Sequence, residues 1–548
     1  MRTASQLVRT LGELLPDLGA DRLEAVRQAF TDRLGPEAPE SSIGLVPNLA
    51  ASRLAGRLDL RGPAYTVDAA CASSLIAVDH AVRELGSGRC DVMLAGGVHH
   101  CHDITFWSVF SQLGALSPSE RIRPFDRGAD GVLIGEGTGV VVLKRLADAE
   151  RDGDRVYAVI KGVGSASDGR ALGLTAPRPE GQYNALTRAY RNAGISPAEV
   201  GLVEAHGTGT VVGDRTELGS LTRVFEEAGA PPGACALGSV KSQIGHTKCA
   251  AGLAGLIKTS LALHTGVKPP TLHLTEPNPA WDAQSSPFAF HTEARPWSAA
   301  PAERVAGVSA FGFGGTNFHV VLRAHGDGPP PVTSAQHWPA ELFTFRGADR
   351  AAAVRAASEL LALVEADPGP YEPWRLRDFA LAASRRAEAA TTRSTTGTAS
   401  TASTASPRGA RTWIAFVAGS TEELTALLRR AITGEHAPKE GLFAADEDET
   451  GDVALLFPGQ GSQRPGMFAE LFVAFPELQR HLRLDETTAR VLFPPDAFDE
   501  TGRKEQQERI TDTTVAQPAL GLTGLAAFQL LTRAGVRPAM AAGHSYGE

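Results

Sequence analysis

The chain of 548 residues is long enough for roughly three or four domains of ordinary size. Its 53 basic and 62 acidic residues give a net charge of −9, which argues against a nucleic-acid-binding surface and suits a soluble enzyme. The five cysteines are few and unevenly spaced, so we expect no disulfide framework and a reducing, cytoplasmic location. No run approaches the roughly 18 apolar residues needed to cross a bilayer, and charges interrupt the opening "MRTASQLVRTLGEL" where a signal peptide would be apolar. We therefore expect neither a nucleic-acid partner nor a membrane.

The first 325 residues predict an α/β fold. Residues 1–40 are polar with apolar side chains near helical spacing, which predicts helices. From about residue 60 to 325 the chain repeats a strand, a glycine-rich turn and a helix, as in "VGLVEAHGTGT" followed by "DRTELGSLTRVF". Such alternation predicts helices layered on a sheet. "RVAGVSAFGFGG" and "NFHVVLR" predict two strands around a glycine-rich turn.

Cys71 lies where a strand-like stretch gives way to a helix-like one. "AYTVDA" (64–69) alternates apolar and polar residues, and "SSLIAVDHAVREL" (73–85) has nearly helical spacing with Gly86 as the expected C-cap. A cysteine at such a turn would present its sulfur near the positive end of the helix dipole, which favours the thiolate. These residues alone leave two interpretations open, a nucleophile or a small buried apolar side chain.

Three further motifs favour the nucleophile. "VEAHGTGT" presents His206 at a strand end, "SVKSQIGHTKCAAG" contains Lys241 and His246, and "SAFGFGGTNFH" supplies glycines and a turn phenylalanine, Phe313. Together with Cys71 they resemble the β-ketoacyl synthase (condensing enzyme) domain of type I polyketide and fatty-acid synthases. The resemblance implies a thiolase-like, layered α/β/α fold.

The resemblance covers about residues 40–325 and implies a role for each motif residue. Cys71 would take an acyl group from a carrier thioester and attack with it a decarboxylated malonyl unit. Two neutral histidines, His206 and His246, would donate Nε2–H to the enolate oxygen that decarboxylation leaves. The family's other roles would be an oxyanion hole from the backbone N–H groups of Cys71 and Phe313, ordering of the histidines by Lys241, and pantetheine contacts by Thr208 and Thr210.

Other candidate sites are weaker. "HHCHD" (99–103) contains metal-ligand residue types without the spacing of a structural zinc site, and "GEGTG" (135–139) is not a dinucleotide fingerprint. We therefore expect no metal and no redox cofactor in this chain. The other cysteines are expected to be inert packing residues: Cys90, Cys101, Cys235 and Cys249.

After "HGDGPPPV" the composition changes, and residues 326–450 are expected to form a small α/β linker domain. Its strand candidates are "LFTFRG" and "TWIAFVAG", and its helix candidates lie near 349–365 and 421–433. Within 391–406, 11 of the 16 residues are Ser or Thr, which predicts a flexible loop without a core.

Residues 451–548 resemble the start of an acyltransferase domain, with an α/β-hydrolase-like fold, that loads malonyl or acyl groups from CoA onto carrier protein. "GHSYG" fits the Gly-x-Ser-x-Gly elbow, so Ser545 would accept the acyl group, and Gln460 in "LLFPGQGSQRPGM" would lie near the oxyanion hole. In the family, the histidine base and the arginine that binds the malonyl carboxylate come well after this serine, and the 548 residues contain neither. We expect residues 451–548 alone not to transfer acyl groups.

The family also has strands before the nucleophile that this chain lacks. We therefore expect residues 1–325 to form an N-terminally truncated condensing domain with uncovered strand edges and apolar surface. The implied partners are an acyl carrier protein, whose phosphopantetheine arm brings acyl and malonyl thioesters, and a second copy of the chain in a homodimer.

Two alternatives to a condensing enzyme remain open. One is an inactive fragment or non-catalytic partner subunit of a multienzyme synthase; the other is a CoA-dependent thiolase, which His246 disfavours. "FSQLGALSPSERIRPFD" and "IGHTKCAAGLAGLIKT" look more like iterative enediyne or polyunsaturated-fatty-acid synthases than like modular ones.

Overall fold

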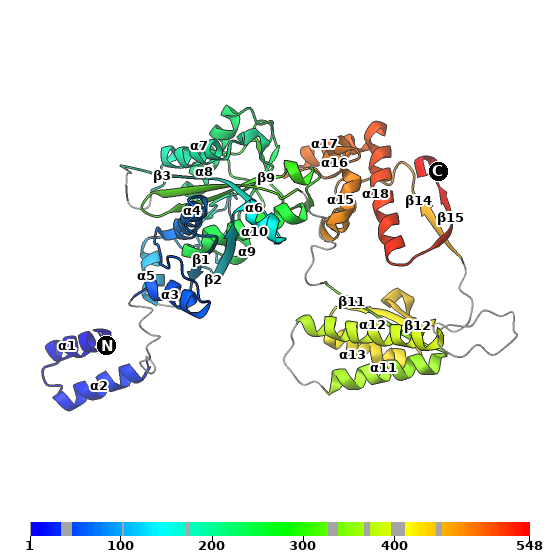
Figure 1. Cartoon of the computed structure of the whole chain (residues 1–548), viewed down its shortest axis with the longest axis horizontal. Coiled ribbons are helices and arrows are strands. Elements are labelled where there is room, and N and C mark those ends of the chain that lie inside the picture. The colour runs from blue at the N-terminus through cyan, green and yellow to red at the C-terminus, as the bar shows by residue number, and fades with distance from the viewer. Residues whose placement is uncertain are drawn as a thin grey trace.

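The computed structural model describes residues 2–33, 46–100, 104–170, 173, 176–326, 338–366, 373–395, 411–444 and 452–547. Two helices, α1 (Arg2–Leu14) and α2 (Ala20–Arg33), open the chain and pack against each other, apart from the α/β body that follows (Figure 1). The helices predicted in the first 40 residues are thus confirmed as far as the described residues reach.

A six-stranded sheet forms the centre of the α/β body. Its strands are β3 (Val159–Ser167), β4 (Leu202–Glu204), β5 (Cys235–Gly238), β7 (Phe288–Ala289), β9 (Val305–Gly312) and β10 (Thr316–Arg323). They lie in the order β3-β10-β9-β4-β5-β7, with β10 antiparallel to both of its neighbours and the strands from β9 to β7 parallel. The two strands predicted around the glycine-rich turn are confirmed as β9 and β10.

Helices cover both faces of this sheet, as the α/β/α prediction requires. They are α4 (Ser73–Gly86), α7 (Pro179–Ala193), α8 (Val211–Glu227) and α10 (Ala251–Thr265). Successive residues of a strand point to opposite faces. Val320 of β10 accordingly packs in a cluster with Leu75 and Leu253 of α4 and α10, while Val321 packs with Leu186 of α7 and with α8. The predicted layered fold is confirmed.

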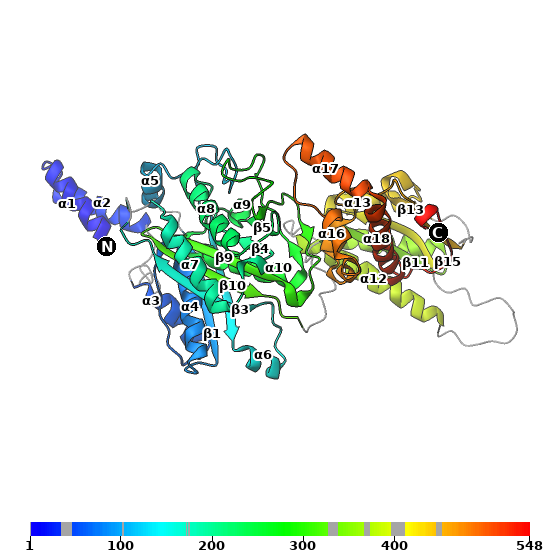
Figure 2. The same ribbon diagram turned by 90° about the horizontal axis from the view of Figure 1, so that it is seen from above.

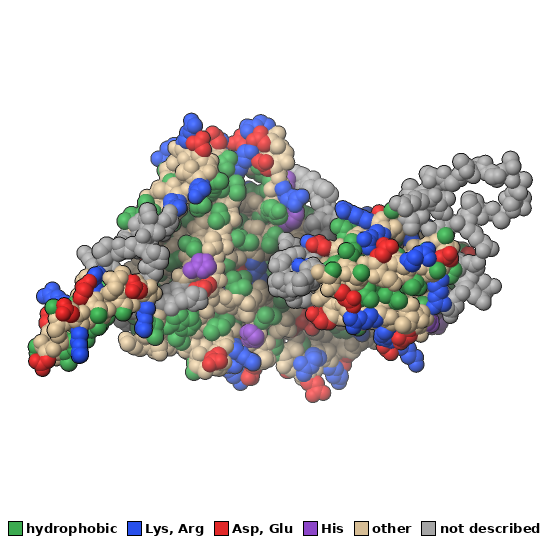
Figure 3. All heavy atoms as spheres, turned by 90° about the horizontal axis from the view of Figure 1, so that it is seen from below, with side chains coloured by type: hydrophobic (Ala, Val, Ile, Leu, Met, Phe, Trp, Pro, Cys, Tyr) green, Lys and Arg blue, Asp and Glu red, His purple; other side chains and the backbone are tan. Residues whose placement is uncertain are grey.

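A separate two-stranded sheet lies outside the layer of α4 and α10. Its strands β1 (Val92–His99) and β2 (Gly137–Lys144) are antiparallel, and one face packs on α4 and α10. Its other face exposes four valines by between 47% and 69%: Val92, Val98, Val140 and Val142. Figure 3, seen from below relative to Figure 1, shows hydrophobic side chains at the surface between the charged groups. This face of the sheet therefore carries exposed apolar side chains.

The strand predicted at 64–69 is wrong. No strand is assigned there, and the chain turns instead into a short 3-10 helix, η2 (Ala70–Ala72). The backbone N–H of Ala69 donates to Ser73 Oγ at 2.9 Å, and that of Ala70 donates to Asp68 Oδ1 at 2.8 Å. Because nearby side chains take these N–H groups, they are not available to a sheet.

The remaining described elements of the body lie around these layers. Two very short strands, β6 and β8, pair antiparallel beside the end of α10. The bounds are α3 (Asn48–Arg57), α5 (Ile104–Gln112), α6 (Leu146–Asp152), α9 (Lys241–Ile244), η4 (Lys248–Ala250), β6 (Val267–Lys268) and β8 (Arg295–Pro296).

Residues 338–444 form a second unit with its own sheet. Its elements are β11 (Glu341–Gly347), α11 (Arg350–Glu365), α12 (Pro373–Thr395), β12 (Arg411–Ala418), α13 (Thr421–Ile432) and β13 (Leu442–Ala444). The core contains Phe343, Phe416 and Leu428, and the predicted strands and helices are confirmed. Of the predicted loop at 391–406, residues 391–395 continue α12, and the rest lies outside the described residues.

The third unit pairs two parallel strands and packs five helices. They are β14 (Val453–Phe457), α14 (Ala469–Ala474), α15 (Gln479–Leu482), α16 (Glu486–Leu492), α17 (Glu500–Thr511), α18 (Thr513–Arg533) and β15 (Pro538–Gly543). Contrary to our expectation, α18 is long and apolar enough to cross a membrane, a test that core helices also pass. Its residues Ala519, Leu520 and Ala526 belong to the same buried cluster as Phe472 of α14, so one side of α18 packs in the core of this unit, while only 33% of its apolar window is buried.

A buried hydrogen-bond network joins the third unit to the α/β body. The two ribbon views show α16 between the body and the rest of this unit (Figures 1 and 2). The buried Gln479 donates its amide to the carbonyls of Thr265 (3.2 Å) and Gly266 (2.9 Å) at the end of α10, and accepts from Arg304 at 3.0 Å. Nearby, Asp496 accepts a hydrogen bond from the Thr292 hydroxyl.

Gly266→Ala is expected to destabilise the protein by about 2–4 kcal/mol. Gly266 has a φ of 67°, and a Cβ there would lie 2.3 Å from Gln479 Oε1 and 2.4 Å from Arg304 Nη1. Gly194→Ala is the matched control, because Gly194 has a φ of 63° with nothing within 4 Å, so it should lose only about 1–2 kcal/mol. Urea unfolding followed by circular dichroism measures both; equal losses would contradict a role for the Gln479 network.

Candidate active site

Cys71 lies in η2, directly before α4, so its sulfur is at the N-terminal end of that helix. The preceding residue, Ala70, has a φ of 51°, a left-handed conformation that costs about 1–2 kcal/mol in a residue other than glycine. The predicted helix is confirmed as α4, although Ser87 rather than Gly86 is its C-cap. The turn therefore presents a buried cysteine where the helix dipole favours a thiolate.

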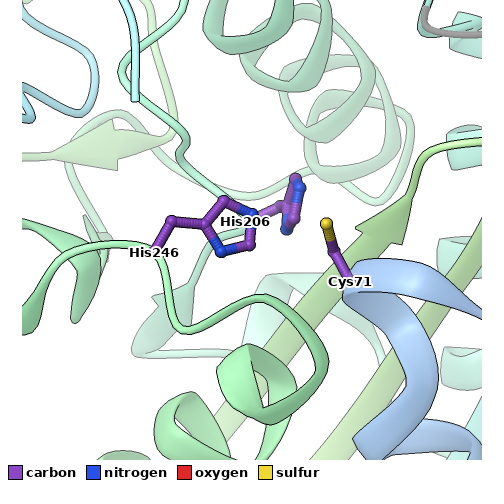
Figure 4. Close-up of side chains that lie close together, drawn as sticks. All are labelled: Cys71, His206 and His246. Atoms are coloured by element: carbon purple, nitrogen blue, oxygen red, sulfur yellow. The ribbon is translucent and has the colours of Figure 1, made fainter. Parts of the chain in front are cut away.

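The structure brings Cys71, His206 and His246 together from three separate segments (Figure 4). The cysteine sulfur and one ring nitrogen of each histidine all lie within 4.8 Å of one another. His206 follows β4 and His246 follows α9, and the two imidazole rings are nearly perpendicular, with centroids 5.5 Å apart. Residues separated by 135 and 40 positions in the sequence thus form one group.

Burial and nearby positive charge favour the neutral form of both imidazoles. Burial holds the pKa of His206 and of His246 well below the usual value, and the ammonium groups of Lys241 and Lys248 lower it further. The backbone N–H of Lys248 donates to His246 Nδ1 at 3.0 Å. Since Nδ1 accepts, the proton of His246 is on Nε2, and His246 offers an N–H donor rather than a lone pair.

A buried carboxylate holds the loop that carries His206. Glu217 of α8 accepts from the backbone N–H of His206 and of Gly207, at 2.7 Å each. Burial raises the pKa of Glu217 to about 7, while these two hydrogen bonds favour the carboxylate. Asp214, one helical turn earlier, accepts from the N–H of Gly209 at 3.1 Å. The sequence interpretation missed both acids, although they lie in the "GTGTVVGDRTEL" stretch.

Lys241 is buried at the start of α9. Burial lowers its pKa, and the carboxylates of Glu204 and Glu217 oppose that shift. Its charge acts on both histidines. The residue predicted to order the histidines is therefore close enough to influence them.

The backbone of Phe313 hydrogen-bonds the sulfur of Cys71 and lowers the pKa of the thiol, in opposition to burial. The predicted oxyanion-hole residue is thus beside the nucleophile. The half-exposed Phe313 ring stacks on Phe110 of α5, with centroids 6.1 Å apart. The turn after Phe313 is held by two residues that the sequence interpretation missed: Asn317 donates to Asp168 at 2.7 Å, and Asp168 N–H donates to Gly315 O at 2.8 Å.

A cavity of about 430 Å³ opens onto this group, within the size range of small-molecule sites. Thr208 and Thr210, the predicted pantetheine contacts, line it with their hydroxyls 2.9 Å apart. Its wall also includes Cys71, His206, His246, Phe313, Lys248, Asp130, Asp168 and Glu217. The predicted site residues of the condensing domain therefore surround one cavity, except Lys241, which is not part of the wall.

The three central side chains suit an oxyanion better than a metal ion. Cysteine and histidine are zinc ligands. However, His246 keeps its proton on Nε2 while Lys248 N–H occupies Nδ1, and two ammonium groups oppose a cation. N–H donors and positive charge instead stabilise negative oxygen. Of the weaker "HHCHD" candidate, residues 101–103 lie outside the described residues.

The predicted acyltransferase residues lie in the third unit. Ser545 follows β15 with a φ of 58°, the strained conformation typical of a nucleophile elbow, and is exposed. A Cβ on Gly459 would lie 3.0 Å from Ser545 Cβ, so the "FPGQG" turn after β14 contacts the elbow. The next residue, Gln460, donates its amide to Thr513 at 3.2 Å.

Family models match most of the chain. The β-ketoacyl synthase N-terminal domain matches residues 23–149, its C-terminal domain 157–275, the ketoacyl-synthetase C-terminal extension 277–386, and the acyl transferase domain 454–548. These matches include Cys71 in the first range.

Two curated relatives are similar over nearly the whole chain. One component of the polyunsaturated fatty acid synthase of Thraustochytrium sp. is 36% identical over 541 residues, which cover 93% of this chain and 19% of that protein. Polyketide synthase GfsA of Streptomyces halstedii is 36% identical over 518 residues, covering 94% of this chain and 6% of that protein. The chain thus spans less than a quarter of the length of either relative. Because the two match equally, the predicted preference for the polyunsaturated type stays a prediction.

A solved structure is similar as well. The ketosynthase from module 6 of the bacillaene synthase of Bacillus subtilis is 29% identical, with a TM-score of 0.50 over 88% of this chain and 75% of that chain. With its thiolase-like layers and the motif residues around one cavity, the chain belongs to the β-ketoacyl synthase family, and residues 454–548 match an acyl transferase domain.

Proposed function

We propose that this chain is a 3-oxoacyl-carrier-protein synthase that extends a Cys71-bound acyl chain by decarboxylative Claisen condensation in polyketide or fatty-acid biosynthesis. The observation that carries the proposal is the convergence of the Cys71 sulfur with two neutral imidazoles in one cavity. A thiol nucleophile and paired neutral donors serve the two half-reactions of such a synthase.

In the first half-reaction the Cys71 thiolate attacks the carbonyl of an acyl thioester on a carrier protein. The bond from sulfur to the acyl carbon forms, and the carrier thiol leaves after taking a proton. The N-terminal end of α4 and the Phe313 backbone stabilise negative charge at this position. The small cavity admits the thioester beside Thr208 and Thr210.

In the second half-reaction a malonyl thioester loses CO2, and the electron pair of the broken carbon–carbon bond forms an enolate. His246 Nε2–H and the neutral His206 donate hydrogen bonds to the enolate oxygen, which lowers the barrier. The enolate carbon then attacks the acyl group on Cys71. A 3-oxoacyl thioester leaves on the carrier, and Cys71 is free again.

The proposed function also implies two binding partners and a cellular location for this chain. An acyl carrier protein supplies both thioesters on phosphopantetheine, and a second copy of the chain forms a homodimer through the condensing domain. Free cysteines at 71, 90, 235 and 249 support a reducing, cytoplasmic compartment.

Intact-mass analysis after incubation with an acyl N-acetylcysteamine thioester tests the proposal. We expect a mass gain of one acyl group in the unmodified protein and in Ser545→Ala, and none in Cys71→Ala. Adding a malonyl thioester should then release CO2 and remove the acyl mass. A cooperatively folded protein that gains no mass would contradict the proposed function and favour a non-catalytic role in a larger synthase.

Ser545→Ala tests the acyltransferase unit in the same assay. With malonyl-CoA, we expect no labelling of Ser545 at a useful rate, because among the described residues no histidine or carboxylate hydrogen-bonds its hydroxyl to act as the base. Rapid labelling that Ser545→Ala abolishes would show that residues 451–548 suffice for acyl transfer.

A further inference from the structure

Lys248 is a buried lysine in the active-site cavity to which the sequence motifs give no role. It follows His246 by two residues at the start of η4, has a φ of 45°, and is only 6% exposed. It lines the same cavity as Cys71. Its ammonium nitrogen lies 3.8 Å from the centroid of the Phe110 ring, over the aromatic face. This cation–π contact fixes the position of a charge at the cavity wall.

The carboxylates that line the cavity among the described residues already accept hydrogen bonds from donors other than Lys248. Glu217 accepts from two backbone N–H groups, Asp168 from Asn317, and Asp130 from Ser117 at 2.6 Å. Among the described residues no carboxylate lies within ion-pair distance of Lys248, whose charge interacts with Cys71, Lys241 and Cys249. Of the two thiols that this charge reaches, Cys71 lines the same cavity as Lys248 and Cys249 does not, so the thiolate of Cys71 is the negative group that can face the ammonium across the cavity.

Lys241 does not fill the same role. It is absent from the cavity wall, and the carboxylates of Glu204 and Glu217 act on its charge more strongly than Cys71 does. Part of its charge is therefore compensated. Lys248 contacts an aromatic ring rather than a carboxylate. Its positive charge therefore acts on the cavity with less compensation than the charge of Lys241.

We propose that Lys248 is the counterion of the Cys71 thiolate, held at the cavity wall by the Phe110 ring so that the buried nucleophile can ionise. The inference rests on the proposed function only in taking Cys71 as the nucleophile. Residue 248 would then be an electrostatic element of the site, beside the two histidines that act on the enolate.

The direction of the pKa shifts agrees with this geometry. Burial raises the pKa of the Cys71 thiol, and the Lys248 charge is the largest of the influences that lower it, ahead of Lys241. In return, burial lowers the pKa of Lys248 to about 8, and Cys71 opposes that change. Below about pH 8 Lys248 is charged and stabilises the Cys71 thiolate. Above about pH 8 Lys248 loses its proton and no longer stabilises the thiolate.

Other ionisable groups surround the pair and enter the pH dependence. Lys241 acts on both Cys71 and Lys248 from outside the cavity wall, and Cys249 is half-buried and next to Lys248 in the sequence. The imidazoles and wall acids are His99, His206, His246, Asp130, Asp168 and Glu217. A test must therefore substitute Lys248 alone and measure the reactivity of Cys71 separately from that of the other cysteines.

Alkylation of Cys71 by iodoacetamide, followed by peptide mass spectrometry on the full chain between pH 6 and 9.5, provides that test. In Lys248→Met and Lys248→Gln we expect the Cys71 rate at pH 7 to fall about tenfold, which corresponds to one pKa unit. The difference in Cys71 alkylation rate between these variants and the unmodified protein should become smaller above pH 8, where Lys248 loses its charge. Lys248→Arg should keep most of the rate at pH 7, since it keeps the charge. Cys90, read in the same digest, should not change.

Lys161→Met is the matched control, because Lys161 is an exposed lysine of β3 outside the cavity. Thermal melting establishes which variants are folded. An unchanged Cys71 profile in folded Lys248→Met or Lys248→Gln would overturn the proposal, as would an equal loss in Lys248→Arg, which would indicate a packing role. If the unmodified protein takes up no acyl group while its alkylation still depends on Lys248, the proposed function fails and the counterion role stands.

Discussion

His206→Ala and His246→Ala are each expected to slow condensation by about 10²–10³-fold while acylation of Cys71 remains measurable. In the proposed reaction each imidazole supplies one donor to the enolate oxygen, and burial and nearby ammonium groups lower the pKa of both rings and so favour their neutral form. The proposed loading step instead uses the N-terminal end of α4 and the Phe313 backbone. The two half-reactions should therefore separate in these variants.

Single-turnover assays on pre-acylated protein measure the effect, with CO2 release and loss of acyl mass as readouts. His246→Gln keeps an N–H donor near the same position and should recover part of the rate. His264→Gln is the control, because His264 is a partly buried histidine of α10 outside the cavity. If the alanine variants lost acylation as strongly as condensation, the histidines would act on the thiol rather than on the enolate.

Lys258→Met is expected to destabilise the protein by about 3–5 kcal/mol. Lys258 Nζ lies 2.9 Å from Glu204 Oε2, and the two side chains are only 12% and 4% exposed. Glu204 also accepts from the backbone N–H of Val240 at 2.6 Å. Removing the lysine leaves a buried carboxylate without its cation, two residues before His206.

Urea unfolding followed by circular dichroism measures this loss. The double variant Glu204→Gln with Lys258→Met removes both charges and should recover a large part of the stability. Arg490→Met breaks an exposed pair with Glu486, whose side chains are 78% and 38% exposed, and should change the stability by less than about 1 kcal/mol. A double variant no more stable than Lys258→Met would show that packing, rather than the unpaired charge, causes the loss.

The local spacing of apolar residues predicted the helices and strands whose residues mainly contact their neighbours along the chain. α4, α11 and α13 have clear apolar spacing, and β9 and β10 are joined by a short glycine turn, so each was visible in the sequence. The pattern failed at 64–69, where Asp68 and Ser73 take the backbone N–H groups that a strand needs. Alternating residue types do not reveal such local competition.

The sequence by itself determined the chemistry of the site. The motifs around Cys71, His206 and His246 specify residue types, order and family, because each is a short continuous stretch. Only the tertiary structure decided how that chemistry is supported. Glu217 holds the His206 loop, and Lys248 N–H determines which nitrogen of His246 carries the proton. Lys248 also lies over Phe110, 138 positions earlier in the chain. Burial, tautomer and charge pairing arise between distant segments, so no local pattern contains them.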